Sequence, residues 1–211
     1  MHTSMRGFLA LAALAAVSVW GAPAAADDGD TCSKASGDEG IAACSRAIAS
    51  GEYKGSDLAK LHFNRGIEYD AKGDGDRAIE DYSEAIALDP NYTRAYNNRG
   101  VHLARKGEFD RAIADYDAAI RLDPKYVNAY GNRGNALRRK GDLDRAIADL
   151  SQAIGLDPKG ANSYYNRGLV WEAKGDLRSA LADYKKYAEL APSDPDGPKV
   201  VERVTKELGA K

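Results

Sequence analysis

A regularly repeated unit constrains this chain more than any other feature of its sequence. Four prolines recur at equal intervals, at Pro90, Pro124, Pro158 and Pro192. The tripeptide Asn-Arg-Gly recurs with the same spacing and begins at Asn64, Asn98, Asn132 and Asn166. The period is about 34 residues, a length typical of solenoids, in which one small unit is copied and stacked. We therefore expect several copies of one unit rather than a single globular core.

Each unit contains the signals for two helices joined by a tight turn. In the second unit we expect one helix from about Ala95 to Arg105 and another from about Asp110 to Leu122. Gly107 can adopt the left-handed conformation that ends a helix, and Pro124 disfavours helix in the residue before it. Gly100 lets the two backbones approach closely. Because neither helix can bury its apolar face alone, the sequence predicts that neighbouring units stack.

These units resemble tetratricopeptide repeats, a family whose pattern of aromatic and small residues recurs with this same period. In the second unit the pattern is carried by Tyr96, Gly100, Leu103, Ala112, Tyr116, Ala119 and Pro124. The resemblance implies an all-α fold, a right-handed superhelical solenoid of helix-turn-helix units with a concave side. It assigns repeats to residues 59–92, 93–126, 127–160 and 161–194.

Both ends of the array are expected to carry caps. Residues 41–48 match the second helix of a repeat, so we interpret residues 27–58 as a linker and a half-repeat without a partner helix. At the other end, a C-terminal capping helix is predicted within residues 195–211. Its apolar face would consist of Val200, Val201, Val204 and Leu208.

The segment formed by residues 1–26 resembles an export signal. Arg6 supplies a positive charge, an apolar run follows from Phe8 to Trp20, and three alanines at positions 24–26 provide a cleavage site. The run is shorter than the roughly 20 residues that cross a bilayer. We therefore expect cleavage before Asp27 and a periplasmic or secreted protein that is soluble and not inserted in a membrane.

The chain has two cysteines, Cys32 and Cys44. In an oxidising compartment we expect them to form a disulfide that holds the N-terminal cap to the chain before it. A redox motif would need two residues between the cysteines, and a zinc site would need more ligands than His62 and His102 supply. No metal or other cofactor is expected.

The charges of the chain are balanced, with 30 Lys and Arg against 32 Asp and Glu. Proteins that bind duplex DNA carry a basic excess, so nucleic acid is not the expected partner. The sequence also lacks a Gly-rich phosphate loop and a nucleophile elbow, and we expect no catalytic activity.

In the family that the units resemble, the first helix of each repeat lines the concave groove, where extended peptides bind. The resemblance places four asparagines at one groove position: Asn64, Asn98, Asn132 and Asn166. An amide offers both a donor and an acceptor, which match a peptide backbone. Four arginines are also expected on the groove: Arg94, Arg105, Arg138 and Arg139. Because guanidinium groups bind carboxylates, the expected ligand is a protein or peptide segment that is acidic or ends in a carboxylate.

Two interpretations of these groove residues stay open. The residues can bind a ligand, or they can be solvated residues on helix faces that bind none. The leading functional hypothesis is an exported scaffold that binds a peptide and assembles an envelope complex. The alternative is a structural protein that associates with itself through its repeat ends or its convex face.

Four further arginines stand where the family usually has leucine: Arg65, Arg99, Arg133 and Arg167. Each is followed at a constant interval by an aspartate, namely Asp81, Asp115, Asp149 and Asp183. A charge near a helix interface is costly unless it is paired. We therefore expect structural ion pairs, either within a unit or between neighbouring units.

Overall fold

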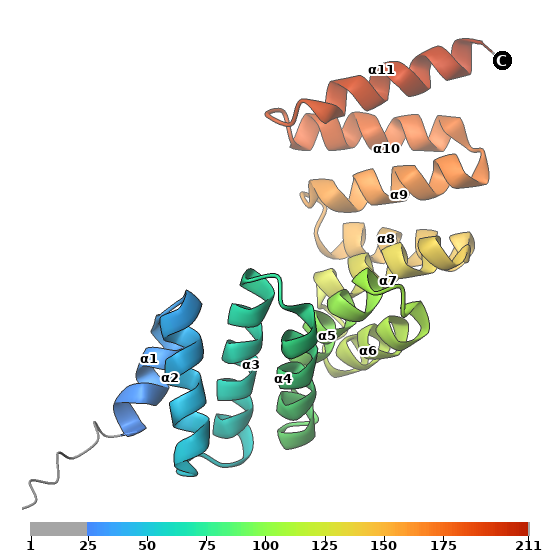
Figure 1. Ribbon diagram of the computed structural model, residues 1–211. Coiled ribbons are helices and arrows are strands. Elements are labelled where there is room, and N and C mark those ends of the chain that lie inside the picture. Colours follow the sequence, from blue (N-terminus) through green and yellow to red (C-terminus); the bar gives the residue numbers. More distant parts are fainter. Residues whose placement is uncertain (1–24, 211) are drawn as a thin grey trace, which may run out of the picture.

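The structure, a computed structural model, describes residues 25–210. Within this range the chain forms eleven α-helices and no strand, arranged as a curved array of antiparallel helices (Figure 1). The helices are α1 (Ala25–Lys34), α2 (Gly37–Ser50), α3 (Gly55–Ala71), α4 (Gly75–Leu88), α5 (Thr93–Arg105), α6 (Phe109–Leu122), α7 (Val127–Lys140), α8 (Leu143–Leu156), α9 (Ala161–Lys174), α10 (Leu177–Leu190) and α11 (Asp196–Gly209). The predicted all-α solenoid is confirmed.

Short turns join the two helices of each repeat. The first helix of the second repeat ends at Gly107, whose φ of 82° is the left-handed conformation that favours glycine. The second helix of the first repeat begins after Asp74, whose side chain accepts a hydrogen bond from the backbone amide of Arg77. α3 is longer than the equivalent helices of the later repeats and begins at Gly55, before the predicted start of the first repeat at residue 59.

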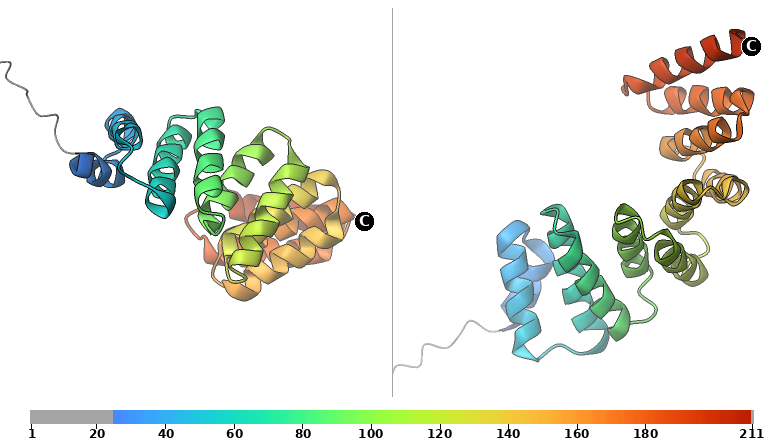
Figure 2. Two further views of the ribbon diagram at one scale, coloured as in Figure 1. Left: turned by 90° about the horizontal axis from the view of Figure 1, so that it is seen from below. Right: turned by 45° about the vertical axis from the view of Figure 1, so that its right-hand side comes forward.

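The first helices of neighbouring repeats contact each other, α5 with α7 and α7 with α9, and so line the inner side of the curve (Figure 2). Close packing within a repeat depends on glycine, as predicted. A Cβ atom added to Gly100 would lie 2.7 Å from Cε1 of Tyr116, and one added to Gly134 would lie 2.8 Å from Cγ of Leu150. Both distances are too short for a carbon–carbon contact, so a side chain at either position would force its neighbours to move.

The predicted Arg–Asp pairs are confirmed, and each joins three helices. Arg99 on α5 donates to both carboxylate oxygens of Asp115 on α6, at 2.8 and 2.7 Å. Its third bond, 3.1 Å long, goes to Oγ of Ser83 on α4 of the preceding repeat. The same arrangement recurs for Arg65, Arg133 and Arg167, whose partners in the preceding unit are Ser45, Asp117 and Ser151. The pairs therefore act both within a repeat and between neighbours.

A second repeating ion pair was not predicted from the sequence. Lys106 at the end of α5 pairs with Asp76 at the start of α4, with 2.7 Å between Nζ and Oδ1. Equivalent pairs are Lys72–Asp38, Lys140–Asp110 and Lys174–Asp144. Their carboxylates are exposed, so each pair contributes only about 0–1 kcal/mol to stability.

The N-terminal cap differs from the prediction, because the supposed linker contains a helix. α1 packs against α2 and also contacts α3, so the N-terminal half-repeat does have a partner helix. The segment lacks the repeat pattern and contains Gly29, which lowers helix propensity; packing on α2 overrides that weakness. The predicted export signal lies outside the described residues except for residues 25–26, which form the start of α1.

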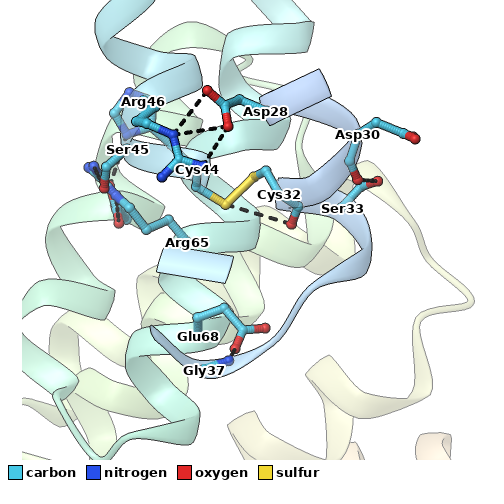
Figure 3. Close-up of a disulfide and its surroundings, with 12 residues drawn as sticks. Asp28, Asp30, Cys32, Ser33, Gly37, Cys44, Ser45, Arg46, Arg65 and Glu68 are labelled. Carbon is cyan, nitrogen blue, oxygen red and sulfur yellow. Dashed lines mark hydrogen bonds and ion pairs between the residues drawn. A yellow bond between two sulfur atoms is a disulfide. The ribbon is translucent and has the colours of Figure 1, made fainter. Parts of the chain in front are cut away.

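Cys32 on α1 and Cys44 on α2 form a disulfide in the structure (Figure 3). Both residues are buried, with 3% and 0% exposure. Next to it, Arg46 on α2 donates to the carboxylate of Asp28 on α1 at 2.6–3.1 Å. The disulfide therefore fixes α1 onto α2 within the N-terminal cap.

Reduction of this disulfide is expected to loosen the N-terminal cap alone. The bond closes a loop between positions separated by 12 residues at one end of the array, and an end unit contacts a single neighbour. Amide hydrogen exchange should rise in α1, in α2 and into the first repeat, while residues 130–156 stay protected. Equal loosening of all four repeats would contradict this assignment. The Cys32→Ser/Cys44→Ser variant is the control for effects of the reductant.

The C-terminal cap is α11, which lies within the predicted residues 195–211 and packs on α10. Arg203 on α11 donates to the carboxylate of Glu172 on α9 at 2.8 and 2.9 Å. Tyr187 replaces a small residue of the other repeats, is buried, and donates its hydroxyl to Asp194. In the described part of the chain, no helix is both long and apolar enough to cross a membrane.

Candidate functional site

A cleft of about 160 Å³ lies between the inner helices α5 and α7, and we call it the central groove. It is lined by Val101, Ala104, Arg105, Tyr116, Asn132, Asn135, Ala136 and Arg139. Three of the eight predicted ligand-binding residues therefore meet here: Arg105, Asn132 and Arg139. They come from two different repeats, and the stacking of those repeats sets their separation.

The two groove arginines differ in their partners. Arg105 lies 3.0 Å from Oδ1 of Asp70 on α3 and is thus partly neutralised. Arg139 pairs with no carboxylate among the described residues, and its guanidinium lies over the ring of Phe109, 4.8 Å from the ring centroid. Such stacking orients a guanidinium while leaving its N–H donors free. Arg139 is therefore the cation best placed to bind an incoming carboxylate.

The helices around the groove carry no opposing charge of their own. Neither α5 nor α7 contains an Asp or Glu residue. Arg99 and Arg133 on these helices are paired with buried aspartates, so their positive charge is already neutralised. The surplus positive charge of the inner surface is therefore concentrated near Arg139.

The asparagines of the second and third repeats form a hydrogen-bonded chain. Nδ2 of Asn132 donates to Oδ1 of Asn97 at 3.0 Å, and Nδ2 of Asn97 donates to Oδ1 of Asn98 at 3.2 Å. Asn97 is 5% exposed. It lies at a position that varies between repeats and was expected to affect specificity, since the equivalent residues are Phe63, Gly131 and Tyr165. The chain fixes the amide of Asn132 at the groove and leaves its Oδ1 available as an acceptor.

The other predicted residues do not line the groove. Asn64 and Asn166 are half-buried on α3 and α9, beyond the cleft. Arg94 is exposed, and its guanidinium lies 5.0 Å from the ring centroid of Phe63. Arg138 is half-buried, and its Nε atom is buried without a hydrogen-bond partner. Of the four equivalent asparagines, Asn132 is the one that lines this cleft, and Asn98 reaches it only through the bond to Asn97.

A larger cavity of about 350 Å³ lies next to the central groove, between the first and second repeats. We call it the His102 pocket; it is lined by Asp70, Gly73, Gly75, Asp76, Ile79, His102, Arg105 and Lys106. Arg105 borders both cavities, so they are adjacent. Sequence reasoning considered His102 only as an insufficient metal ligand.

Burial lowers the pKa of His102 below its ordinary value, and the nearby charge of Arg105 lowers it further. Asp70 opposes this shift, with Oδ1 lying 3.2 Å from Nε2. The imidazole is therefore neutral at pH 7. Among the described residues, no group of three or more His, Cys, Asp or Glu side chains could hold a metal ion.

Comparison with solved structures shows the same architecture. MamA is 26% identical, with a TM-score of 0.69 over 80% of this chain and 90% of that one. The first TPR of Spaghetti (RPAP3), bound to the HSP90 peptide SRMEEVD, is 26% identical, with a TM-score of 0.56 over 59% of this chain and 99% of that one. YrrB, a TPR protein with an unusual peptide-binding site, is 20% identical, with a TM-score of 0.65 over 77% and 81% of the two chains, and supports the fold alone.

Sequence comparisons identify the repeats directly. No curated protein sequence matches the chain. Models of the tetratricopeptide repeat match residues 63–127, 115–148 and 161–194, and a model of the TPR repeat matches residues 134–175. Together they cover the four helix pairs from α3 to α10. The chain therefore belongs to the tetratricopeptide repeat family.

Proposed function

We propose that this protein is a non-catalytic interaction scaffold that binds an acidic peptide segment, or a C-terminal carboxylate, in its central groove. Proteins of this family typically mediate protein–protein interactions. The observation that carries the proposal is the meeting of Arg139, Arg105 and Asn132 in one cleft between α5 and α7, two helices that contain no acidic residue. Guanidinium groups favour carboxylates, and an amide suits the peptide backbone beside them.

Similar proteins support this choice of ligand. The first TPR of Spaghetti was solved with the peptide SRMEEVD, which contains two glutamates and ends in aspartate. In the central groove of this protein, Arg139 on α7 supplies the cation and Asn132 supplies the amide.

Export to the periplasm or the cell exterior, followed by assembly of an envelope complex, is part of the same proposal. It is supported by the signal-like segment 1–26 and by the buried Cys32–Cys44 disulfide, since disulfides persist mainly in oxidising compartments. The second candidate function is self-association through the repeat ends or the convex face. Sedimentation at rising concentration separates them, because a scaffold should remain monomeric.

Groove variants test the peptide-binding proposal. With the peptide SRMEEVD as probe, Asn98→Ala/Asn132→Ala is expected to weaken binding by about 1–3 kcal/mol through lost hydrogen bonds. Arg139→Ala should weaken it by about 1.5–3 kcal/mol, because the lost bond is charge-assisted. Fluorescence anisotropy measures both affinities. Arg139→Ala should hardly change the melting temperature, whereas Asn98→Ala/Asn132→Ala should lower it, because the buried amide of Asn97 loses both partners.

Arg121→Ala is the matched control, since Arg121 is an exposed arginine on the outer helix α6. It should bind the probe as the wild type does. Amidation of the peptide's C-terminus should mimic Arg139→Ala if the terminal carboxylate is the group that Arg139 binds. Equal affinity of the wild type, Arg139→Ala and Asn98→Ala/Asn132→Ala would exclude the central groove as the binding site.

A further inference from the structure

The His102 pocket lies where the first two repeats depart from the pattern at two positions: Gly75 opens space, and the larger His102 partly fills it. Gly75 stands where the later repeats have large apolar residues, namely Phe109, Leu143 and Leu177. His102 stands where the next two repeats have Ala136 and Val170. The side chain that fills this space at the other repeat interfaces is therefore missing here, and a cavity of about 350 Å³ remains.

The next interface shows what fits such a space. There the ring of Phe109 fills the position equivalent to Gly75, and it lies 4.8 Å from the guanidinium of Arg139. Arg105 is the equivalent of Arg139 one repeat earlier, and it borders the His102 pocket. An aromatic ring entering beside Gly75 would therefore meet the guanidinium of Arg105 as Phe109 meets Arg139.

The pocket also presents a polar atom that its own walls do not satisfy. His102 is 4% exposed, and its Nδ1 lies 3.1 Å from the point where a Cβ atom of residue 75 would be. Nδ1 thus faces the space beside Gly75. The ring nitrogen that is buried without a hydrogen-bond partner is Nε2, which lies 3.2 Å from Oδ1 of Asp70. An imidazole nitrogen that faces a cavity favours a ligand that carries a hydroxyl or N–H group.

We propose that the His102 pocket binds a tyrosine side chain of the peptide that occupies the central groove. The ring would take the place that Phe109 takes in the next repeat, against Ile79 and Arg105, and the hydroxyl would bind His102. A charged side chain fits less well, because Arg105 and Lys106 are already paired with Asp70 and Asp76. The volume lies at the lower end of the range for ligand pockets. This inference rests on the proposed function, since Arg105 connects the pocket to the groove.

The first experiment uses p-cresol, the side chain of tyrosine, as the probe. In ¹⁵N–¹H spectra of the full protein, p-cresol should shift the amide signals of Gly73, Gly75 and His102 and reach saturation. Toluene, which lacks the hydroxyl, should bind about tenfold more weakly, the factor expected for one hydrogen bond. Absence of saturable shifts at these residues, or shifts confined to other repeats, would overturn the proposal.

Two variants identify the groups responsible. Gly75→Phe/His102→Ala copies Phe109 and Ala136 of the next interface, so it should fold and lose p-cresol binding. Gly75 does not have a positive φ, and a side chain there strains no backbone. The single variant His102→Ala keeps the cavity and should bind p-cresol and toluene equally. Unchanged discrimination between the two probes would show that His102 does not bind the hydroxyl.

Peptides then test the tyrosine itself. Acidic heptapeptides carrying one Tyr at successive positions are compared with the same peptides carrying Ala. The peptide with Tyr at one particular position should bind about tenfold more tightly than its Ala counterpart. Gly75→Phe/His102→Ala should remove that gain and leave the affinity of the Ala peptides unchanged. If acidic peptides bind but no register responds to Tyr, this inference fails and the proposed function stands. If p-cresol binds and no acidic peptide does, the proposed function fails. The proposal that a peptide's tyrosine occupies the His102 pocket then fails as well.

Discussion

Replacing Arg133 by leucine, the residue that the family usually has there, is expected to lower the free energy of unfolding by about 3–5 kcal/mol. Arg133 donates to the two carboxylate oxygens of Asp149 at 2.7 and 2.6 Å and to Asp117 at 2.5 Å. These bonds raise the pKa of Arg133 above its ordinary value, although burial opposes the shift. Without the guanidinium, Asp149 would be left 7% exposed with no counter-charge. Urea unfolding measures the loss.

Two controls separate the buried charge from lost packing. Adding Asp149→Leu to Arg133→Leu should recover much of the stability, because an apolar pair often replaces a buried ion pair at little cost. Lys140→Ala removes an exposed ion pair from the same helix and should cost less than about 1 kcal/mol. If Arg133→Leu cost no more than Lys140→Ala, the Arg–Asp pairs would contribute little to the fold.

The repeat spacing explains why so much of the fold could be predicted. An arginine that recurs once in every repeat, with an aspartate always at the same interval after it, must meet that aspartate wherever the two helices of a repeat are antiparallel. The third partner of each arginine lay in the sequence too, because Ser83, Asp117 and Ser151 precede Arg99, Arg133 and Arg167 by one constant interval. That contact crosses between repeats, so its recognition required the stacking geometry.

The features that escaped prediction are those that occur only once. α1 carries no copy of the repeat, and its helix is stabilised by contacts with α2 and by the disulfide rather than by a sequence pattern. Gly75 looks like an ordinary residue near a turn until it is aligned with Phe109. Only the packing of α3, α4 and α5 shows that the missing ring leaves a cavity.

The candidate site was predicted in part, for a similar reason. The repeat assigned four asparagines and four arginines to one surface, and equivalence suggested that they act alike. Their neighbours differ, however: Asn97 binds Asn132, and Asp70 pairs with Arg105. The hydrogen-bonding groups that the groove offers therefore depend on variable residues beside the repeated ones. A pattern that repeats one residue in every unit does not describe those neighbours.

Gly134→Leu is expected to lower the free energy of unfolding by about 1–3 kcal/mol or more, through overpacking between α7 and α8. A Cβ atom at this position would lie 2.8 Å from Cγ of Leu150 and 3.3 Å from the backbone oxygen of Ala146. Leu150 is 0% exposed, so it has no free space to move into. The backbone oxygen cannot move without shifting α8. Thermal and urea unfolding measure the effect.

Gly131, one turn earlier on α7, provides an internal control. A Cβ atom there would meet nothing within 4 Å, so Gly131→Ala should instead raise the free energy of unfolding by about 0.5–1 kcal/mol. The two glycines share a helix and its backbone entropy, so opposite signs can arise only from contacts across the helix pair. If both variants were stabilising, α7 and α8 could not be packed as closely as the structure places them. The close contact of Gly100 with Tyr116 would then need the same test.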